Sequence, residues 1–458
     1  MKRPVLFAVF ALAALAAPAA AQDRPFDAAQ GGAQGKRGFV WDDRPSIVFG
    51  EDINVELKGR IQMDGRWFDP EIEEEAFELR TVRVGLKGEL TRHFDWEIER
   101  EIDEVVIVTE ENADLVAIGA VEPVWRFGDW KDVFINWSTF DALGIKAGRF
   151  KMPFGLEQNT SVSDLDFAYR TLGSTKIAPG RDRGVMVYGE LLDGSLVYEA
   201  GVFDDDGDNG ELEEPRFVIE GEDLEGLGPS FAVRVVGEVF RRLPVPDRLK
   251  GAEIGIAYTR AYVPEGLNSL KGEDYWGYDF FDQVYVQGHR QRLGLQFDWS
   301  PGPLGFKSEW MRSTEERLGQ SNRNQDLSGF IGTAWYTSAT WIVTGEDKDG
   351  DVTPNEPLFQ GGLGLFELGV RYDRLTFRSE LEAGTPFRNP RSDYLLPNTV
   401  GTLTFGGNWL VNRWIKVVAN GLRQSYDDLE RTPAIVGVEE RGTEKHYWSG
   451  LLRLQIAF

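Results

Sequence analysis

The chain has no cysteine among its 458 residues and only three histidines, His93, His289 and His446. Without thiolates there is no disulfide and no thiolate metal site, and three scattered histidines leave little for an imidazole site. A hydrolase would need a histidine beside an activated serine and a carboxylate. The sequence shows neither a nucleophile elbow nor a His-Glu-x-x-His pair, so it predicts no enzyme, no metal and no cofactor.

Basic residues are scarce relative to acidic ones. The chain has 50 Lys and Arg against 75 Asp and Glu, which gives a formal net charge of −25. Neutralising the phosphates of a nucleic acid requires a basic footprint, and a chain this acidic does not supply one by its overall charge. The composition therefore excludes nucleic acid as a partner.

Long apolar runs are missing, with one exception at the N-terminus. Lys2 and Arg3 precede an apolar run over residues 5–17, and a Pro-Ala-Ala-Ala segment follows it. The run is shorter than the ~20 residues that a membrane helix needs. This three-part pattern is typical of a signal peptide, so we expect residues 1–21 to be removed on export, with Gln22 as the first mature residue. Losing two cations takes the net charge from −25 to −27.

The segment after the predicted signal peptide is short and rich in small residues. Residues 22–50 include a Gly-Gly-Ala-Gln-Gly stretch, which favours a flexible periplasmic arm. An energy-coupled outer-membrane receptor would need a large N-terminal plug domain, and this arm is too short to supply one. Residues 51–458 carry no Pro/Ser-rich linker and are expected to form a single domain.

The main positive signal is a strict two-residue alternation of apolar and polar side chains. In residues 53–64 the apolar face holds Ile53, Val55, Leu57, Ile61 and Met63, with Gly59 among them. The polar face holds Asn54, Glu56, Lys58, Arg60, Gln62 and Asp64. Because a strand projects successive side chains to opposite faces, this pattern predicts a strand, and its length suits a tilted bilayer crossing.

Comparable segments recur about 16 times, an even number that single-chain bacterial barrels prefer. Tight links at 192–195, 300–303 and 411–412 carry turn residues. Longer polar stretches separate them, at 204–228, 263–288, 314–328 and 427–442. The alternation of short and long connections predicts an all-β, transmembrane antiparallel barrel with periplasmic turns and long extracellular loops. The stretch 345–361 is long where a short turn is expected.

The last twelve residues end on an aromatic side chain. Leu452, Leu454, Ile456 and the terminal Phe458 share one face of an alternating segment, and Arg453 and Gln455 lie opposite. Such an ending makes sense if this strand closes the barrel against the first one and faces lipid. We therefore expect outer-membrane lipid as a partner and Phe458 as the contact with the barrel-assembly machinery.

At this point the chain resembles the phosphate-selective porin O and P family of Gram-negative outer membranes, over nearly all of the mature sequence. The similar segments are Ala147–Glu157, Ala178–Gly184, Gly201–Asp204, Trp335–Tyr336, Thr344–Glu346, Glu367–Leu375, Gly406–Trp409 and Arg453–Phe458. The resemblance implies a 16-stranded, trimeric porin of the outer membrane whose third long loop folds into the lumen. The acidic insert at 101–129 and the net charge depart from the family pattern.

The candidate constriction is the segment 151–182, which proline and glycine stiffen at both ends. Six basic residues in and beside it are the predicted anion-binding set: Arg149, Lys151, Arg170, Lys176, Arg181 and Arg183. Three more, Lys58, Arg60 and Arg83, fall on predicted lumen faces and extend the basic track along the wall. Arginine suits phosphate through its planar, bidentate fork. The alternative is that these arginines pair with neighbouring carboxylates, such as Asp182, and only rigidify the loop.

An aspartate-rich stretch at 204–210 admits two interpretations. Carboxylates at alternate positions can bind calcium, but the glycine stands at the fourth position and Pro215 occupies the twelfth, where the EF-hand pattern has a bidentate glutamate. The other interpretation is a solvated acidic loop on the extracellular side.

Together these observations predict a porin that lets small anions such as phosphate or polyphosphate diffuse passively across the outer membrane. The alternative is a general or cation-leaning porin without phosphate preference, which the acidic total favours.

Overall fold

The computed structural model describes most of the predicted barrel. The described residues are 38–41, 44–49, 52–72, 76–105, 124–210, 229–350, 352–435 and 444–458. The predicted signal peptide, 1–21, lies outside them, as do residues 22–37 of the predicted arm and the aspartate-rich region's continuation at 211–228. Residues 106–123, the middle of the acidic insert, also lie outside, whereas strands extend into it from both sides.

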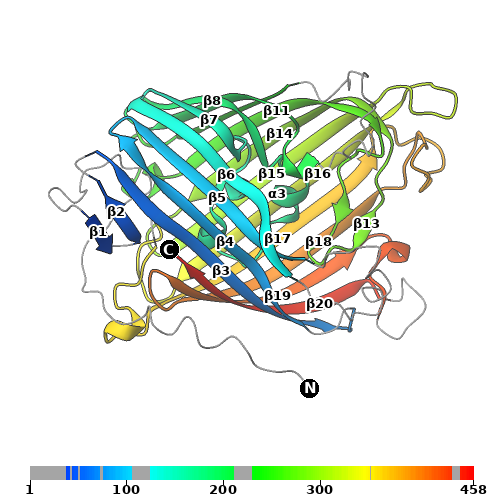
Figure 1. Ribbon diagram of the computed structural model, residues 1–458. Coiled ribbons are helices and arrows are strands. Elements are labelled where there is room, and N and C mark those ends of the chain that lie inside the picture. The colour runs from blue at the N-terminus through cyan, green and yellow to red at the C-terminus, as the bar shows by residue number, and fades with distance from the viewer. Residues whose placement is uncertain are drawn as a thin grey trace.

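Sixteen antiparallel strands in the described part of the chain close into a barrel (Figure 1). They are β3 (Asn54–Asp69), β4 (Ala76–Thr91), β5 (Phe94–Val105), β6 (Val124–Phe140), β7 (Leu143–Lys151), β8 (Arg181–Leu191), β9 (Leu196–Phe203), β10 (Ser230–Glu238), β11 (Glu253–Gly266), β14 (Val286–Trp299), β15 (Leu304–Arg317), β16 (Leu327–Ile342), β17 (Leu365–Ser379), β18 (Asn398–Leu410), β19 (Ile415–Tyr426) and β20 (His446–Ala457). Each pairs with its neighbours in sequence, and β20 pairs with β3 from Trp448↔Asp69 to Ala457↔Arg60. The predicted strand number and closure are confirmed.

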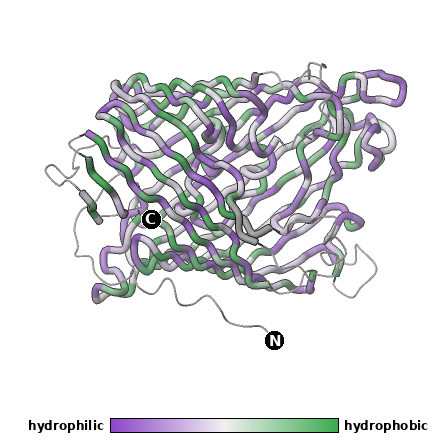
Figure 2. The backbone as a smooth tube through the Cα atoms, in the orientation of Figure 1, coloured by the Kyte–Doolittle hydropathy of each residue, from purple (hydrophilic) through white to green (hydrophobic). Residues whose placement is uncertain are grey.

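Hydrophilic and hydrophobic residues alternate along the strands (Figure 2), and the burial of the side chains places most polar ones inside the barrel and many apolar ones on its outer face. Arg60, Gln62 and Asp64 of β3 are buried, as the alternation predicts, whereas Leu452 of β20 is 51% exposed. The largest fully buried side chains include four arginines, Arg290, Arg292, Arg317 and Arg371. A soluble sandwich would show the reverse distribution, so the outer face is built to contact hydrocarbon.

The connections sort by length to the two ends of the barrel. Tight turns join β8 to β9, β14 to β15 and β18 to β19, and the long polar connections lie at the other end, as expected. At the tight-turn end, α4 (Asp247–Lys250) lies between β10 and β11. The connection from β16 to β17 spans residues 343–364, includes η3 (Leu358–Gln360), and is long although it lies at the short end.

Two connections, one of them predicted, fold into the barrel. The first, L3 (residues 152–180), contains α2 (Leu156–Asn159), η1 (Val162–Asp164) and α3 (Leu172–Lys176). The second, L5 (residues 267–285), carries the small pair β12 (Gly272–Glu273) and β13 (Asp279–Phe281). Apolar residues of both loops pack on inward side chains of the wall in one buried cluster that includes Phe154, Leu172, Phe280, Phe281, Phe330 and Phe377. The sequence resemblance implied only the first of these loops.

A hairpin precedes the barrel. Within the segment expected to be a flexible arm, β1 (Gly38–Trp41) pairs with β2 (Pro45–Val48), and β2 pairs with the start of β3. In Figure 1 this hairpin projects beside the barrel at the end where β3 begins. None of the helices in the described residues combines the length and the apolar character that a bilayer crossing requires.

Candidate functional site

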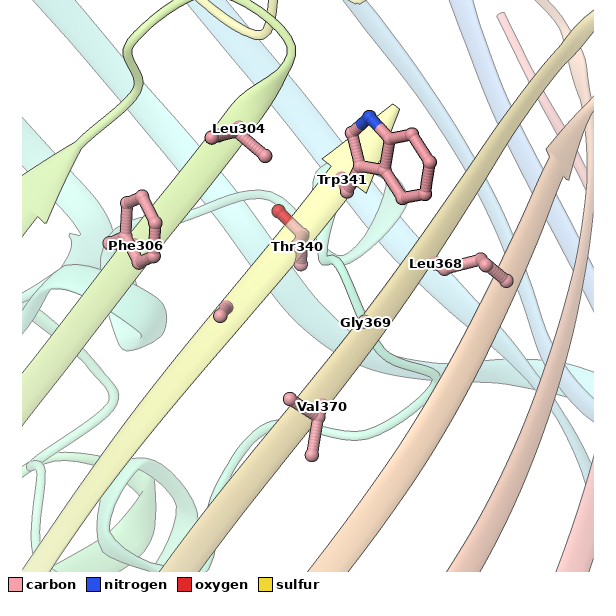
Figure 3. A pocket seen from close by; sticks show the side chains of 8 residues that line it. Leu304, Phe306, Thr340, Trp341, Leu368, Gly369 and Val370 are labelled. Atoms are coloured by element: carbon pink, nitrogen blue, oxygen red, sulfur yellow. The ribbon is translucent and has the colours of Figure 1, made fainter. Parts of the chain in front are cut away.

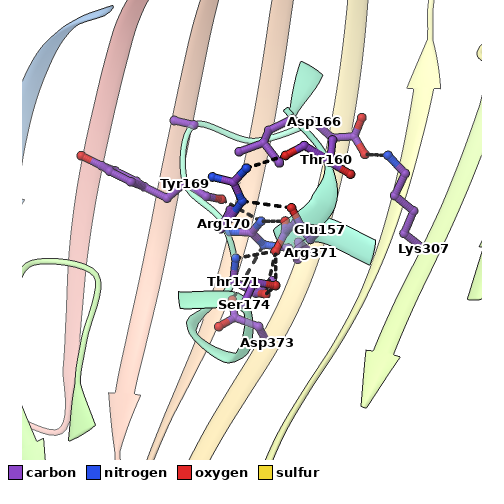
Figure 4. A network of polar contacts seen from close by, with 12 residues as sticks. Glu157, Thr160, Asp166, Tyr169, Arg170, Thr171, Ser174, Lys307, Arg371 and Asp373 are labelled. Carbon is purple, nitrogen blue, oxygen red and sulfur yellow. Dashed lines mark hydrogen bonds and ion pairs between the residues drawn. The ribbon is translucent and has the colours of Figure 1, made fainter. Parts of the chain in front are cut away.

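L3 is fastened to the wall formed by β15 and β17 through buried charges (Figure 4). Arg371 of β17 binds Glu157 of L3 at 3.0 Å, and the backbone N–H groups of Leu156 and Glu157 donate to the Glu309 carboxylate of β15 at 2.6 and 3.0 Å. The other oxygen of Glu157 accepts from the Thr171 N–H and hydroxyl at 2.6 and 2.7 Å. These bonds fix the helical part of L3 against one side of the lumen.

A second anchor joins L3 to the long connection at the tight-turn end. Asp166 of L3 binds Lys307 of β15 at 3.0 Å and Lys348 at 2.7 Å. Lys348 belongs to the 343–364 connection and also pairs with Glu367 of β17. Burial alone would raise the pKa of the Asp166 carboxyl, but Lys307 and Lys348 hold that pKa well below its usual range. Because this connection is long, its residue Lys348 reaches into the lumen and binds Asp166 of L3.

Two glycines let L3 approach the wall closely. The ring of Phe167 lies against Gly369 of β17 and Gly406 of β18, where an added Cβ would stand 3.0 and 2.9 Å from ring carbons. These glycines belong to the segments Glu367–Leu375 and Gly406–Trp409 that carry the family resemblance. Two of the segments that carry the family resemblance therefore contain the glycines against which L3 packs.

Three of the predicted cations converge on residues 159–163 of L3. Lys151 donates to the carbonyls of Asn159 and Thr160 at 3.2 and 2.9 Å, and Arg170 donates to the Thr160 carbonyl at 2.5 Å. From β3, Arg60 reaches the hydroxyls of Ser163 and Ser161 at 3.0 and 3.4 Å. Within the described residues, none of these three cations forms a salt bridge, so their charge is not neutralised by a direct partner. We call Arg60, Lys151 and Arg170 the basic triad.

The charge of Arg170 in the basic triad persists at neutral pH. Burial lowers the pKa of the Arg170 guanidinium to about 10, which still leaves it protonated at pH 7. Its acceptors are carbonyl oxygens, which orient the guanidinium without cancelling its charge. The triad is therefore a positively charged site at the point where L3 meets the wall.

The other predicted lumen cations face carboxylates. Lys58 pairs with Glu97 and lies 3.2 Å from Glu99, Arg83 lies 3.5 Å from Glu99, and Arg181 lies 2.7 Å from Asp132. Glu101 extends this group by binding Arg83 at 3.2 Å and Lys131 at 2.6 Å. For Arg83 and Arg181 the pairing alternative raised from the sequence holds, although with partners on β5 and β6 and not with Asp182.

The remaining three predicted residues lie elsewhere. Arg149 and Arg183 stand opposite each other in register, in the same row as Val133 of β6. Arg183 is 70% exposed, like Val185 and Val187 at the next alternate positions on the outer face, and it pairs with Asp204 at 2.7 Å. The alternation ends at the start of β8, where Arg181 binds Asp132 instead. Lys176 contacts Glu273 of L5 at 2.5 Å.

Two acidic groups invite a metal interpretation. The carboxylates of Glu97, Glu99 and Asp132 lie within 4.8 Å of one another, but Lys58, Arg83 and Arg181 already bind them. They are the counter-charges of the wall cations.

The aspartates at 204–210, including η2 (Asp208–Gly210), are also held by arginines. Asp206 is buried against Arg290 and Arg292, Asp204 binds Arg183, and Asp208 binds Arg149. Asp206 is therefore part of a buried ion-pair network, whereas Asp204 and Asp208 remain exposed.

The outer face carries a hollow of its own, of about 280 Å³, over β15, β16 and β17 (Figure 3). Exposed apolar side chains dominate its lining, among them Leu304, Trp341, Leu368 and Val370. It lies outside the lumen and contains none of the charged residues above.

A comparison of the sequence with models of protein families agrees with this barrel. The family model described as phosphate-selective porin O and P matches residues 55–437, most of the chain. The chain belongs to this family. As a member of this porin family it is an outer-membrane channel protein, and the predicted resemblance is confirmed. No protein in a search of curated relatives matches the chain.

Solved porin structures share the fold of this porin at low sequence identity. OmpT of Vibrio cholerae, folded in vitro, superposes with a TM-score of 0.52 at 8% identity, covering 90% of this chain and 99% of that one. The outer membrane channel DcaP of Acinetobacter baumannii gives a TM-score of 0.51 at 9% identity, covering 89% and 98%. OmpT in its trimer form gives 0.50 at 8% identity, covering 89% and 100%. At these identities the likeness shows the fold alone.

Sequence reasoning missed the residues that position the basic triad and the acidic side of the wall. Glu309, Lys348 and Arg371 lie on strands or turns far in sequence from L3, and Glu97, Glu99 and Asp132 were not singled out. The alternation around Ile98 did place Glu97 and Glu99 on the lumen side, so a signal for the acidic group existed.

Proposed function

We propose that this porin conducts small anions by passive diffusion, with phosphate or polyphosphate as the preferred solute class. The observation that supports this best is the basic triad, in which three cations from β3, β7 and L3 donate only to hydroxyl and carbonyl oxygens. A cation held by neutral acceptors keeps its charge for a passing ion, whereas one bound to a carboxylate is largely neutralised.

The geometry of the triad suits an oxyanion. Two guanidinium groups offer planar forks that match phosphate oxygens, and Lys151 adds a compact positive charge beside them. Arg83 stands opposite Arg60 on the neighbouring strand and Arg181 stands opposite Lys151, so these two paired cations add to the positive charge around the triad. Selectivity in a wide barrel depends on such rings of charge at the narrowest point.

We also propose the signal peptide, the N-terminal arm, the trimer and the role of Phe458 that the sequence led us to expect. Residues 1–21 serve as the cleaved signal peptide and residues 22–50, which include the hairpin of β1 and β2, as a periplasmic arm. The porin assembles as a homotrimer, for which the trimer form of OmpT is a structural precedent. Phe458 pairs with Gly59 through both backbone bonds at 3.0 Å and caps the closing seam, where the barrel-assembly machinery would read it.

A second candidate is a cation-leaning pore. Glu253 of β11 and Asp298 of β14 stand directly opposite each other on the lumen side, and neither forms a salt bridge among the described residues. Together with the net charge of −25, this pair favours cations near the tight-turn end. The basic triad lies on β3, β7 and L3 and the acidic pair on β11 and β14, so the two candidates place selectivity on different parts of the lumen wall.

Planar-bilayer recording under a salt gradient separates the two. The porin reconstituted without variants is measured for reversal potential, then titrated with phosphate on one side. An anion-selective current that phosphate blocks supports the proposed function. A cation-selective current that ignores phosphate would reject it in favour of the second candidate.

A further inference from the structure

The hairpin before the barrel carries an exposed apolar face. Phe39 and Trp41 of β1 are 67% and 48% exposed, and Ile47 and Phe49 in and after β2 are 44% and 63% exposed. Phe39 stands opposite Ile47 in register, and alternation places Trp41 and Phe49 on the same face as these two. We call these four residues the aromatic foot.

The aromatic foot continues the outer face of the barrel. Ile47 stands opposite Val55 of β3, and two residues further along β3, Leu57 stands opposite Leu86 of β4, which is 43% exposed. The opposite face of the hairpin carries the smaller side chains of Val40, Ser46 and Val48, and Arg44, just before β2, lies 3.8 Å from Glu56. The large exposed apolar side chains of the hairpin therefore lie on the side that continues the lipid-facing wall.

The hairpin also lies past the end of the closing strand. β20 pairs with β3 as far as Ala457↔Arg60, and the terminal Phe458 bonds Gly59. β2 then takes over the same edge of β3 at residues 54–56 and covers backbone groups that would otherwise stand unpaired. This position is beyond the closing strand, at the tight-turn rim of the barrel wall.

We propose that the aromatic foot binds the membrane–water interface of the periplasmic leaflet, with its rings among phospholipid headgroups. Aromatic side chains are enriched at this depth because one ring can contact both acyl chains and hydrated groups. Continuity with the lipid-facing wall and position at its rim select lipid as the occupant. The inference rests on the outer-membrane placement and is independent of which solute the channel carries.

Fluorescence quenching tests the proposal, because a chain without cysteine accepts a single labelled one. Ile47→Cys carries the fluorophore on the foot, and Val48→Cys carries it on the adjacent residue that faces the opposite way. Both full chains are reconstituted in phosphatidylcholine vesicles brominated near the headgroup, and channel conductance verifies that each has folded. We expect quenching of the Ile47→Cys label to exceed that of the Val48→Cys label by about twofold or more.

Two outcomes would overturn the proposal. Equal and weak quenching at both positions would place the foot in water. Weak lipid quenching with energy transfer between differently labelled copies at Ile47→Cys would show that a second copy of the chain, and not lipid, covers this face.

Discussion

Lysine and arginine side chains on the two sides of the barrel interior differ in their burial and in their partners. On the packed side, formed by β14 to β19, Arg290 and Arg292 have fully buried side chains and share Asp206, and Arg371 holds Glu157. On the charged side, formed by β3 to β8 with L3, the side chains of Lys58, Arg83 and Arg181 keep 13–24% exposure. The basic triad on that side has no carboxylate partner among the described residues.

The difference separates cations that hold loops in place from cations that face solute. A buried ion pair contributes little net charge, but removing one partner leaves the other uncompensated at a large cost. A cation held by carbonyl and hydroxyl oxygens has no opposite charge beside it and retains its field. The acidic composition is therefore compatible with a basic constriction, because many of the carboxylates of the interior are used as loop anchors.

The largest effect is expected from Asp206→Asn on the packed side. The change leaves Arg290 and Arg292 buried without their shared carboxylate, so we expect a loss of about 3–5 kcal/mol in unfolding free energy. Thermal or denaturant unfolding of the reconstituted porin measures it. Asp204→Asn, which breaks the exposed pair with Arg183, is the matched control and should change stability by less than about 1 kcal/mol.

The pH dependence of this effect follows from the charge of Asp206. Burial alone would raise the pKa of its carboxyl, but Arg292 and Arg290 hold that pKa below its usual range. The stabilisation is thus present above the unfolded pKa of about 3.9 and is lost as the pH falls through the lower folded value. The deficit of Asp206→Asn should be the same at pH 7 and pH 5; a deficit that vanishes by pH 5 would contradict the pairing.

A smaller effect is expected from Lys348→Met, which removes one anchor of L3. Charged hydrogen bonds of this kind contribute about 1.5–3 kcal/mol, so L3 should fluctuate more and the open channel should close more often. Single-channel closure frequency is the measurement. Asp349→Asn on the same connection, where the side chain is exposed, serves as the control. Identical closure frequencies in Lys348→Met and the unsubstituted porin would show that the connection does not hold L3.

Asp132→Asn sharpens the comparison by converting a paired cation into an unpaired one. Freed from its partner at 2.7 Å, Arg181 should behave like a member of the basic triad. We expect phosphate to block at about two- to fivefold lower concentration, equivalent to about 0.5–1 kcal/mol for one partly exposed charge. Weaker block would mean that Asp132 orients Arg181 for the solute.

The smallest effect is expected from Arg183→Gln. Its side chain is 70% exposed and lies on the outer face, so selectivity should not change and stability should stay within about 0.5 kcal/mol. A shifted reversal potential in this variant would place Arg183 in the ion path and contradict the register.

The sequence predicts what depends on local periodicity. The alternation in β3 assigned Arg60 to the lumen side and Ile61 to the outer face. The same rule applied to Val185 and Val187 places Arg183 on the outer face, but it fails for Arg181, which binds Asp132 at the start of β8. The closure of β20 on β3 followed from an apolar chain end. These inferences succeed because the two-residue period of a strand is fixed by backbone geometry.

The path of L3 through the lumen cannot be predicted from the local periodicity of the sequence. Asp166 meets Lys348 across 182 residues and Glu157 meets Arg371 across 214, and no local pattern encodes those pairs. Lys151 and Arg170 could be named as basic residues of the loop, but whether each met a carboxylate or a carbonyl depended on its folded course. L5 was missed as a second inner loop, although its aromatic residues Tyr275, Trp276, Tyr278, Phe280 and Phe281 were a signal for burial.

The most direct test compares reversal potentials under a salt gradient for the unsubstituted porin, the Arg60→Gln/Lys151→Gln/Arg170→Gln variant and the Arg183→Gln control. If the basic triad sets selectivity, the triple variant loses anion preference and phosphate block while the control keeps both. An unchanged reversal potential in the triple variant, with conductance showing an intact channel, would contradict the account.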